Sequence, residues 1–147
     1  GSVIDFAMND KCAAGTGRFF EVMANVLQLD IREMGAESLK SEKPCRISNT
    51  CTVFAETEMV SLRARGEMRE DIVAGIHLAA ASRIVSMARS VGFRQEVMLT
   101  GGVSKNRGIK KFLEERIGKP IVIPDEPQIV GAVGAALLAA AELSKAG

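Results

Sequence analysis

The chain has 147 residues, of which 47% are apolar, so it is long and apolar enough to bury a core as one domain. Its 19 basic and 18 acidic residues leave a net charge of +1, which excludes a basic field large enough to attract nucleic acid or an anionic membrane surface. There is no run of about 20 apolar residues that would span a bilayer, and no signal-peptide pattern at the start. We therefore expect a cytoplasmic protein with a small-molecule or protein partner.

The chain begins with a predicted strand and a glycine-rich loop. Residues 1–2 are typical of a cloning remnant, and the apolar residues 3–8 predict a strand already under way, so we expect sequence upstream. The loop at 11–17 leads into a helix, because apolar residues recur at helical spacing from Phe19 onward.

A short second helix and a polar connection come next. Asp30 and Glu33 resemble a capping box at the start of a helix that Gly35 would end. Residues 36–46 are polar and contain a proline, which predicts a surface connection.

The rest of the chain alternates between helices and strands. The predicted helices cover 53–62, about 70–91, 109–117 and 129–143, and the predicted strands cover 97–99 and 120–123. Gly66 and Gly118 follow two of these helices and are expected to end them. The alternation predicts an α/β layered fold with a partly parallel sheet flanked by helices.

Cys12 and Cys51 share one setting, since each lies in a polar loop just before a predicted helix start. The unpaired N–H groups and the dipole of a helix start favour an anion, such as a thiolate or a negatively charged iron–sulfur cluster. A four-iron cluster ordinarily takes four thiolates, so a cluster here would lie on the two-fold axis of a homodimer. Spacing alone also leaves both as ordinary buried residues, or one as a reactive thiol. Cys45 and His77 are assigned no role, because neither has that setting.

The turn Thr100-Gly101-Gly102-Val103 lies between a predicted strand and a predicted helix. Glycines there let a ligand press against the backbone, whose N–H groups point outward, and a nucleotide would suit such a turn. Lys105 would contact phosphate or ribose. A plain connecting turn is the alternative interpretation.

Four segments together resemble the C-terminal half of the activator ATPases of 2-hydroxyacyl-CoA dehydratases, a group that includes the ATPase subunits of benzoyl-CoA reductase. These segments are Asn9–Phe19, Thr50–Glu56, Ala74–His77 and Thr100–Asn106. The resemblance runs in order from about Val3 to the final helix. It implies an actin-like, sugar-kinase-like fold of the ribonuclease-H-like class, with residues 1–147 as a single C-terminal domain and the N-terminal half missing.

The same resemblance implies an ATP-driven electron donor. In such a protein, Cys12 and Cys51 of two subunits would bridge one [4Fe-4S] cluster, and ferredoxin or flavodoxin would supply its electrons. The partner would be an acyl-CoA dehydratase or reductase. The turn of Gly101, Gly102 and Val103, with Lys105, would bind the adenosine end of ATP or ADP, which that family uses with Mg²⁺.

The chain departs from the family pattern in lacking the two phosphate-binding loops of the N-terminal half. We therefore expect this chain alone to hydrolyse ATP poorly or not at all. Two alternatives stay open: half of a non-redox sugar kinase, which would transfer phosphate without iron, and a non-catalytic dimerisation module.

Overall fold

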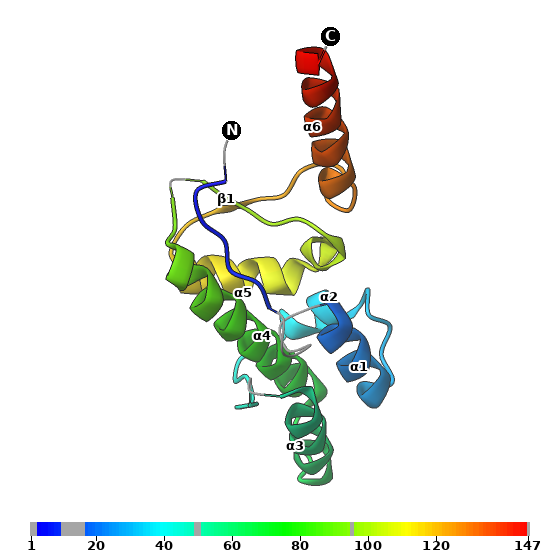
Figure 1. Ribbon diagram of the computed structural model, residues 1–147. Coiled ribbons are helices and arrows are strands. Elements are labelled where there is room, and N and C mark those ends of the chain that lie inside the picture. Colours follow the sequence, from blue (N-terminus) through cyan, green and yellow to red (C-terminus); the bar gives the residue numbers. More distant parts are fainter. Residues whose placement is uncertain (1–2, 10–16, 49–50, 95, 147) are drawn as a thin grey trace.

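The structure is a computed structural model that describes residues 3–9, 17–48, 51–94 and 96–146 (Figure 1). Its elements are α1 (Gly17–Leu27), α2 (Met34–Ser38), α3 (Thr52–Ala64), α4 (Arg69–Val91), β1 (Val97–Met98), the 3₁₀ helix η1 (Gly102–Lys105), α5 (Arg107–Ile117), β2 (Ile121–Val122) and α6 (Val130–Ala146). The two strands are parallel, with Val97 opposite Ile121. The predicted alternation of helices and strands is confirmed from α3 to the end.

Helix α4 forms the centre of the molecule, with α1 and α2 beside it, α3 at one end and α5 crossing the other (Figure 1). Its length and apolar composition would also suit a membrane span. However, ten of its residues are buried among the neighbouring helices, including Ile72, Val73 and Ile76 at 0% exposure. Such burial is typical of the core helix of a globular domain.

The strand predicted at residues 3–8 does not form. Residues 3–9 have neither helical nor strand structure, and the side chains of Val3, Ile4, Phe6 and Met8 are 72–82% exposed. A strand requires a neighbour to pair its backbone groups, and the sheet within the described residues contains β1 and β2 only. The apolar pattern of this segment suits a strand. Among the described residues, however, it has no neighbouring strand to pair with.

The second helix was also predicted wrongly at both ends. Asp30 makes no capping box, because its carboxylate accepts from the backbone N–H of Arg32 at 2.8 Å and pairs with the guanidinium of the same residue. Gly35 lies inside α2 instead of ending it. A Cβ at Gly35 would be 2.5 Å from Oδ1 of Asn106, so this glycine lets the start of α5 approach α2.

The connection predicted at 36–46 is partly in the core. Glu37 and Ser38 belong to α2 and are only 7% and 1% exposed. Glu37 is tolerated there because Lys40 and Arg69 both pair with its carboxylate. The polar pattern alone did not distinguish a solvated loop from a buried, paired charge.

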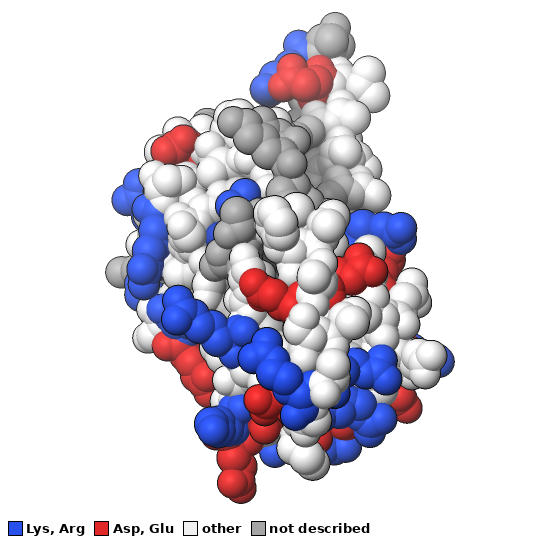
Figure 2. All heavy atoms as spheres, turned by 90° about the horizontal axis from the view of Figure 1, so that it is seen from below, with Lys and Arg blue, Asp and Glu red and all other residues white. Residues whose placement is uncertain are grey.

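Helix α6 stands apart from the other helices (Figure 1), and nearly all of its side chains are exposed. At the opposite end, seen from below in Figure 2, basic and acidic side chains lie next to one another, with a band of Lys and Arg between acidic groups. The charges of both signs are therefore mixed over that face.

Candidate functional site

The turn between β1 and α5 has a closely defined backbone. Gly101 has φ 86° and ψ 177°, a conformation that residues with a Cβ essentially do not adopt. Its N–H donates to the carbonyl of Pro127 at 2.7 Å, and its own carbonyl accepts from the hydroxyl of Ser104 at 2.7 Å. The N–H of Asn106 then donates to the carbonyl of Val103 at 3.0 Å. The turn is thus held on both sides before α5 begins.

This turn forms one wall of a cavity of about 530 Å³. The structure brings together all four residues that the sequence predicted for the adenosine end of a nucleotide, since Gly101, Gly102, Val103 and Lys105 all line the cavity. Thr100 and Asn106 complete this wall. The volume is typical of a small-molecule site.

The opposite wall comes from α1 and from the loop that follows it, through Gly17, Phe20, Glu21, Ile31 and Arg32. Sequence reasoning missed these residues. Phe20 is in the core, with 2% of its surface exposed, and spacing along the helix does not reveal which cavity a core residue borders. Apolar side chains on both walls and a few charged groups at the rim would suit a base and a sugar.

Two of the charged groups at the rim, Arg32 and Glu21, are paired. Arg32 binds the carboxylate of Asp30, and this hydrogen bond lowers the pKa of Asp30 to about 2. Glu21 accepts a hydrogen bond from Arg18 at 2.9 Å. Lys105 is exposed at the edge of the turn. The cavity is therefore bordered by charges of both signs.

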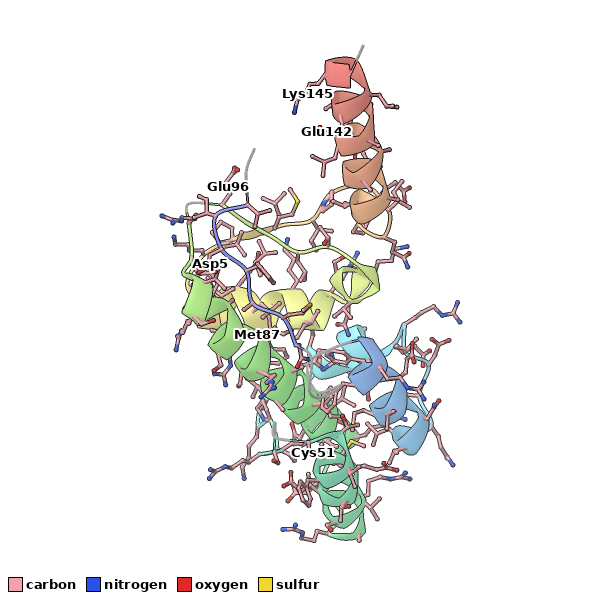
Figure 3. All side chains as sticks on the ribbon, in the orientation of Figure 1. Asp5, Cys51, Met87, Glu96, Glu142 and Lys145 are labelled. Atoms are coloured by element: carbon pink, nitrogen blue, oxygen red, sulfur yellow. The ribbon has the colours of Figure 1, made fainter. Side chains whose placement is uncertain are left out.

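Cys51 lies at the N-cap of α3, as the sequence predicted (Figure 3). Its backbone is extended, with φ −152° and ψ 141°, and its side chain makes no capping hydrogen bond. The thiol is free and half-buried. Beside it, the hydroxyl oxygen of Thr52 is buried and has no hydrogen-bond partner among the described residues. Cys12, the other predicted ligand, lies outside the described residues.

Cys45 has a different setting from Cys51. Its backbone N–H donates to the carbonyl of Asp71 at 2.9 Å, and its carbonyl lies against Gly75 of α4. Burial, with help from the nearby carboxylates of Glu67 and Asp71, raises the pKa of its thiol. A raised pKa disfavours the thiolate, which is the form that binds a metal. Within the described residues there is also no group of three or more His, Cys, Asp and Glu side chains that could hold a metal ion.

Comparisons with known proteins assign the family. Residues 1–139 match the model of the BadF/BadG/BcrA/BcrD ATPase family. The chain belongs to this family. It is 47% identical over 139 residues to the 2-hydroxyisocaproyl-CoA dehydratase activator of Clostridioides difficile, covering 95% of this chain and 52% of the relative. It is 38% identical over 144 residues to a benzoyl-CoA reductase subunit from Thauera aromatica, covering 93% of this chain and 51% of the relative.

A solved structure of the same family has the same fold. The activator of the 2-hydroxyisocaproyl-CoA dehydratase from Clostridium difficile, solved with bound ADPNP, superposes with a TM-score of 0.90 at 45% sequence identity. The match covers 98% of this chain and 54% of that structure. This BadF/BadG/BcrA/BcrD ATPase chain therefore has the activator-ATPase fold, and it spans about half the length of the curated relatives it matches.

Proposed function

We propose that the chain is the C-terminal part of an ATP-dependent activator, which transfers electrons to an acyl-CoA dehydratase or reductase. The observation that carries this proposal is the 530 Å³ cavity, in which a glycine turn at the end of β1 faces α1. A strand–turn–helix arrangement of this kind suits a nucleotide. The relatives named above, a dehydratase activator and a component of benzoyl-CoA reductase, support the partner class.

In this proposal the cavity takes the adenosine end of ATP or ADP. Ile31 and Val103 supply apolar surface on opposite walls, against which a base would pack. Lys105 supplies the positive charge nearest the turn, and the backbone at Gly101 and Gly102 lets the ligand approach closely. Phosphates and Mg²⁺ would be held by the other half of the protein. We therefore expect the 147-residue chain alone to bind nucleotide weakly and to turn over no ATP.

We further propose that Cys51 and Cys12 of two copies of the chain hold one [4Fe-4S] cluster. Cys51 fits this role, because its thiol is free and lies at the start of a 13-residue helix, where backbone N–H groups favour a negative charge. When bound, such a cluster supplies a carrier of one electron at low potential. A ferredoxin or flavodoxin in the cytoplasm would reduce it.

Anaerobic reconstitution with iron and sulfide tests this proposal directly. We expect about four irons per dimer, as one shared cluster requires, and a dimer in analytical ultracentrifugation. Cys51→Ala and Cys12→Ala should each abolish the cluster absorption. Cys45→Ala is the matched control and should retain it, because the pKa of the Cys45 thiol is raised and its backbone carbonyl lies against α4. Normal iron content in Cys51→Ala would contradict the assignment.

The reconstituted and the iron-free chain also separate the two alternative functions. A sugar-kinase half would bind adenine nucleotide without iron, and a dimerisation module would form dimers with neither. Isothermal titration with ADP, performed on the iron-loaded and the iron-free chain, distinguishes the three outcomes.

A further inference from the structure

His77, the single histidine of the chain, lies in the middle of α4 with 0% of its surface exposed. Its Nδ1 is 2.8 Å from the carbonyl oxygen of Val73, one turn earlier in the helix. A carbonyl oxygen only accepts, so Nδ1 carries the proton and Nε2 is left as an acceptor. Burial lowers the pKa of this imidazole, which keeps the ring neutral.

The acceptor Nε2 faces Asn106, whose Nδ2 is 2.9 Å away. The same Asn106 caps α5, because its Oδ1 accepts from the backbone N–H groups of Gly108 at 2.9 Å and Ile109 at 3.1 Å. One amide orientation therefore satisfies both sides: Nδ2 donates to the imidazole and Oδ1 accepts from α5. Asn106 also lines the cavity and closes the turn through Val103.

The imidazole also supports the other wall. The ring of Phe20, which borders the cavity from α1, lies 5.0 Å from the imidazole, centroid to centroid. Phe112 of α5 packs at 5.9 Å. The fit is tight, since a Cβ at Gly108 would be 2.9 Å from Cδ2 of His77. Residues from both walls of the cavity, Phe20 and Asn106, therefore contact His77.

We propose that His77 is a positioning residue, which holds Asn106 and Phe20 and thereby sets the spacing of the two walls that receive the nucleotide. The inference rests on the proposed nucleotide function for its consequence, but its structural part concerns the turn itself and is testable without any ligand. If His77 were an ordinary core residue, its substitution would destabilise the whole domain. The turn would then lose no more protection than the rest of the core.

The first test measures amide hydrogen exchange in His77→Leu, His77→Gln and a matched control, Val85→Ala. Val85 is on the same helix, is 3% exposed and does not line the cavity. In His77→Leu we expect the amides of Asn106, Gly108 and Ile109 to exchange about tenfold faster relative to the remaining core, the equivalent of one lost hydrogen bond. His77→Gln retains an acceptor and should recover part of the protection. Uniform loss in all three variants would overturn the proposal.

A second test remains informative if His77→Leu does not fold. Asn106→Asp keeps the oxygen that caps α5 but replaces the donor to Nε2 with a carboxylate, so His77 must take up a proton to restore the pair. With one histidine in the chain, ¹⁵N NMR of the imidazole reports this residue alone. We expect the neutral Nδ1–H form in the wild type at neutral pH, and a protonated ring in Asn106→Asp that loses its proton as the pH rises. An unchanged ring signal would overturn the proposal.

Among the described residues, the groups that face the imidazole are neutral, so this protonation can be assigned to the new carboxylate. They are Phe20 from α1, the carbonyl of Val73 on α4, Phe112 of α5 and Asn106 at the N-cap of α5. Helix α2 also packs on α4, and its buried carboxylate, Glu37, is already paired with Lys40 and Arg69.

Titration with ADP then tests whether the position of the turn affects nucleotide binding. The ADP affinity of Asn106→Asp, divided by that of the wild type, should fall as the pH rises, because the imidazole loses its proton. If the imidazole of the variant protonates but this ratio does not change with pH, the proposal that His77 affects nucleotide binding is overturned. If the wild type binds no ADP at all, the proposed nucleotide function fails, while exchange and NMR still decide whether His77 positions the turn.

Discussion

Gly101 is the residue on which the geometry of the turn depends most directly. Its φ of 86° and ψ of 177° place the N–H toward Pro127 and the carbonyl toward Ser104. An added Cβ would meet no neighbouring atom within 4 Å, so the constraint comes from the backbone alone. This makes the position a clean test of backbone strain.

We expect Gly101→Ala to lower the free energy of unfolding by about 1–3 kcal/mol, the usual cost of a residue with a Cβ in this region, and to weaken ADP binding. Gly131→Ala is the matched control: Gly131 lies in α6 with nothing within 4 Å, and alanine there should stabilise the helix by about 0.5–1 kcal/mol. Urea unfolding measures both variants. Equal stabilities of Gly101→Ala and the wild type would contradict the role of the backbone conformation.

Asp30 and Arg32 form a second local unit at the rim of the cavity. The hydrogen bond from Arg32 lowers the pKa of Asp30 to about 2 from 3.8. A folded-state pKa below the unfolded value means that the pair favours folding above about pH 3.8, and that this contribution is lost as the pH falls through about 2. The contribution is present throughout the physiological range.

We expect Arg32→Gln to raise the pKa of Asp30 toward 3.8, because the charged donor is removed. A ¹³C NMR titration of the carboxyl carbons measures this shift. Arg18→Gln is the control, since Arg18 pairs with Glu21 and should leave Asp30 unchanged. If the pKa of Asp30 is the same in Arg32→Gln and the wild type, the pair does not persist in solution.

At the scale of elements, Glu37 joins α2 to α4. Its side chain is 9% exposed and pairs with Lys40 of the following loop at 2.5 Å and with Arg69 of α4 at 3.0 Å. The hydrogen bond from Lys40, followed by that from Arg69, lowers the pKa of Glu37 against the opposing effect of burial. The short α2 is thus attached to the core helix by charge as well as by packing.

We expect Glu37→Gln to cost about 1–2 kcal/mol, less than for a fully buried pair because both cations are partly solvated. Glu142→Gln is the control, since Glu142 pairs with Lys145 on the exposed α6 (Figure 3) and should cost less than about 0.5 kcal/mol. Because the folded pKa of Glu37 is lowered, its contribution is present above pH 4.5 and is lost below it. Unfolding measured across this range should show that loss in the wild type and not in Glu37→Gln.

Helix starts and stops were the elements best predicted from the sequence. Gly66 and Gly118 follow α3 and α5 with φ of 79° and 73°, and Cys51 precedes α3 as expected. These signals are local, because a cap or a terminating glycine acts within one turn of the helix. The start of α2 was missed because Arg32, two residues away, binds the carboxylate of Asp30 that would have capped it.

At the scale of the molecule, α6 exposes an apolar surface. Val133, Leu137, Leu138 and Leu143 are 48–76% exposed. Exposed apolar side chains that cluster on a surface are typical of a site where another protein surface packs. We therefore expect the 147-residue chain on its own to self-associate as its concentration rises.

The double change Leu137→Gln and Leu138→Gln should reduce this association and the binding of an apolar dye, with little effect on the free energy of unfolding, because both side chains are 67–69% exposed. Light scattering measures the association, and Glu142→Gln on the same helix is the control that should not change it. Association that persists undiminished in the double variant would place the contact elsewhere.

The sequence by itself determined the order of elements from α3 onward, the glycine turn and the cysteine at a helix start, because each depends on residues adjacent in the chain. The roles of the predicted ligands remain predictions, since Cys12 lies outside the described residues. Only the tertiary structure decided that Phe20 and Arg32 border the same cavity as the turn, that Gly35 admits α5, and that His77 contacts Asn106. These contacts join residues at least 29 positions apart, and spacing along a chain carries no information about which buried faces will meet.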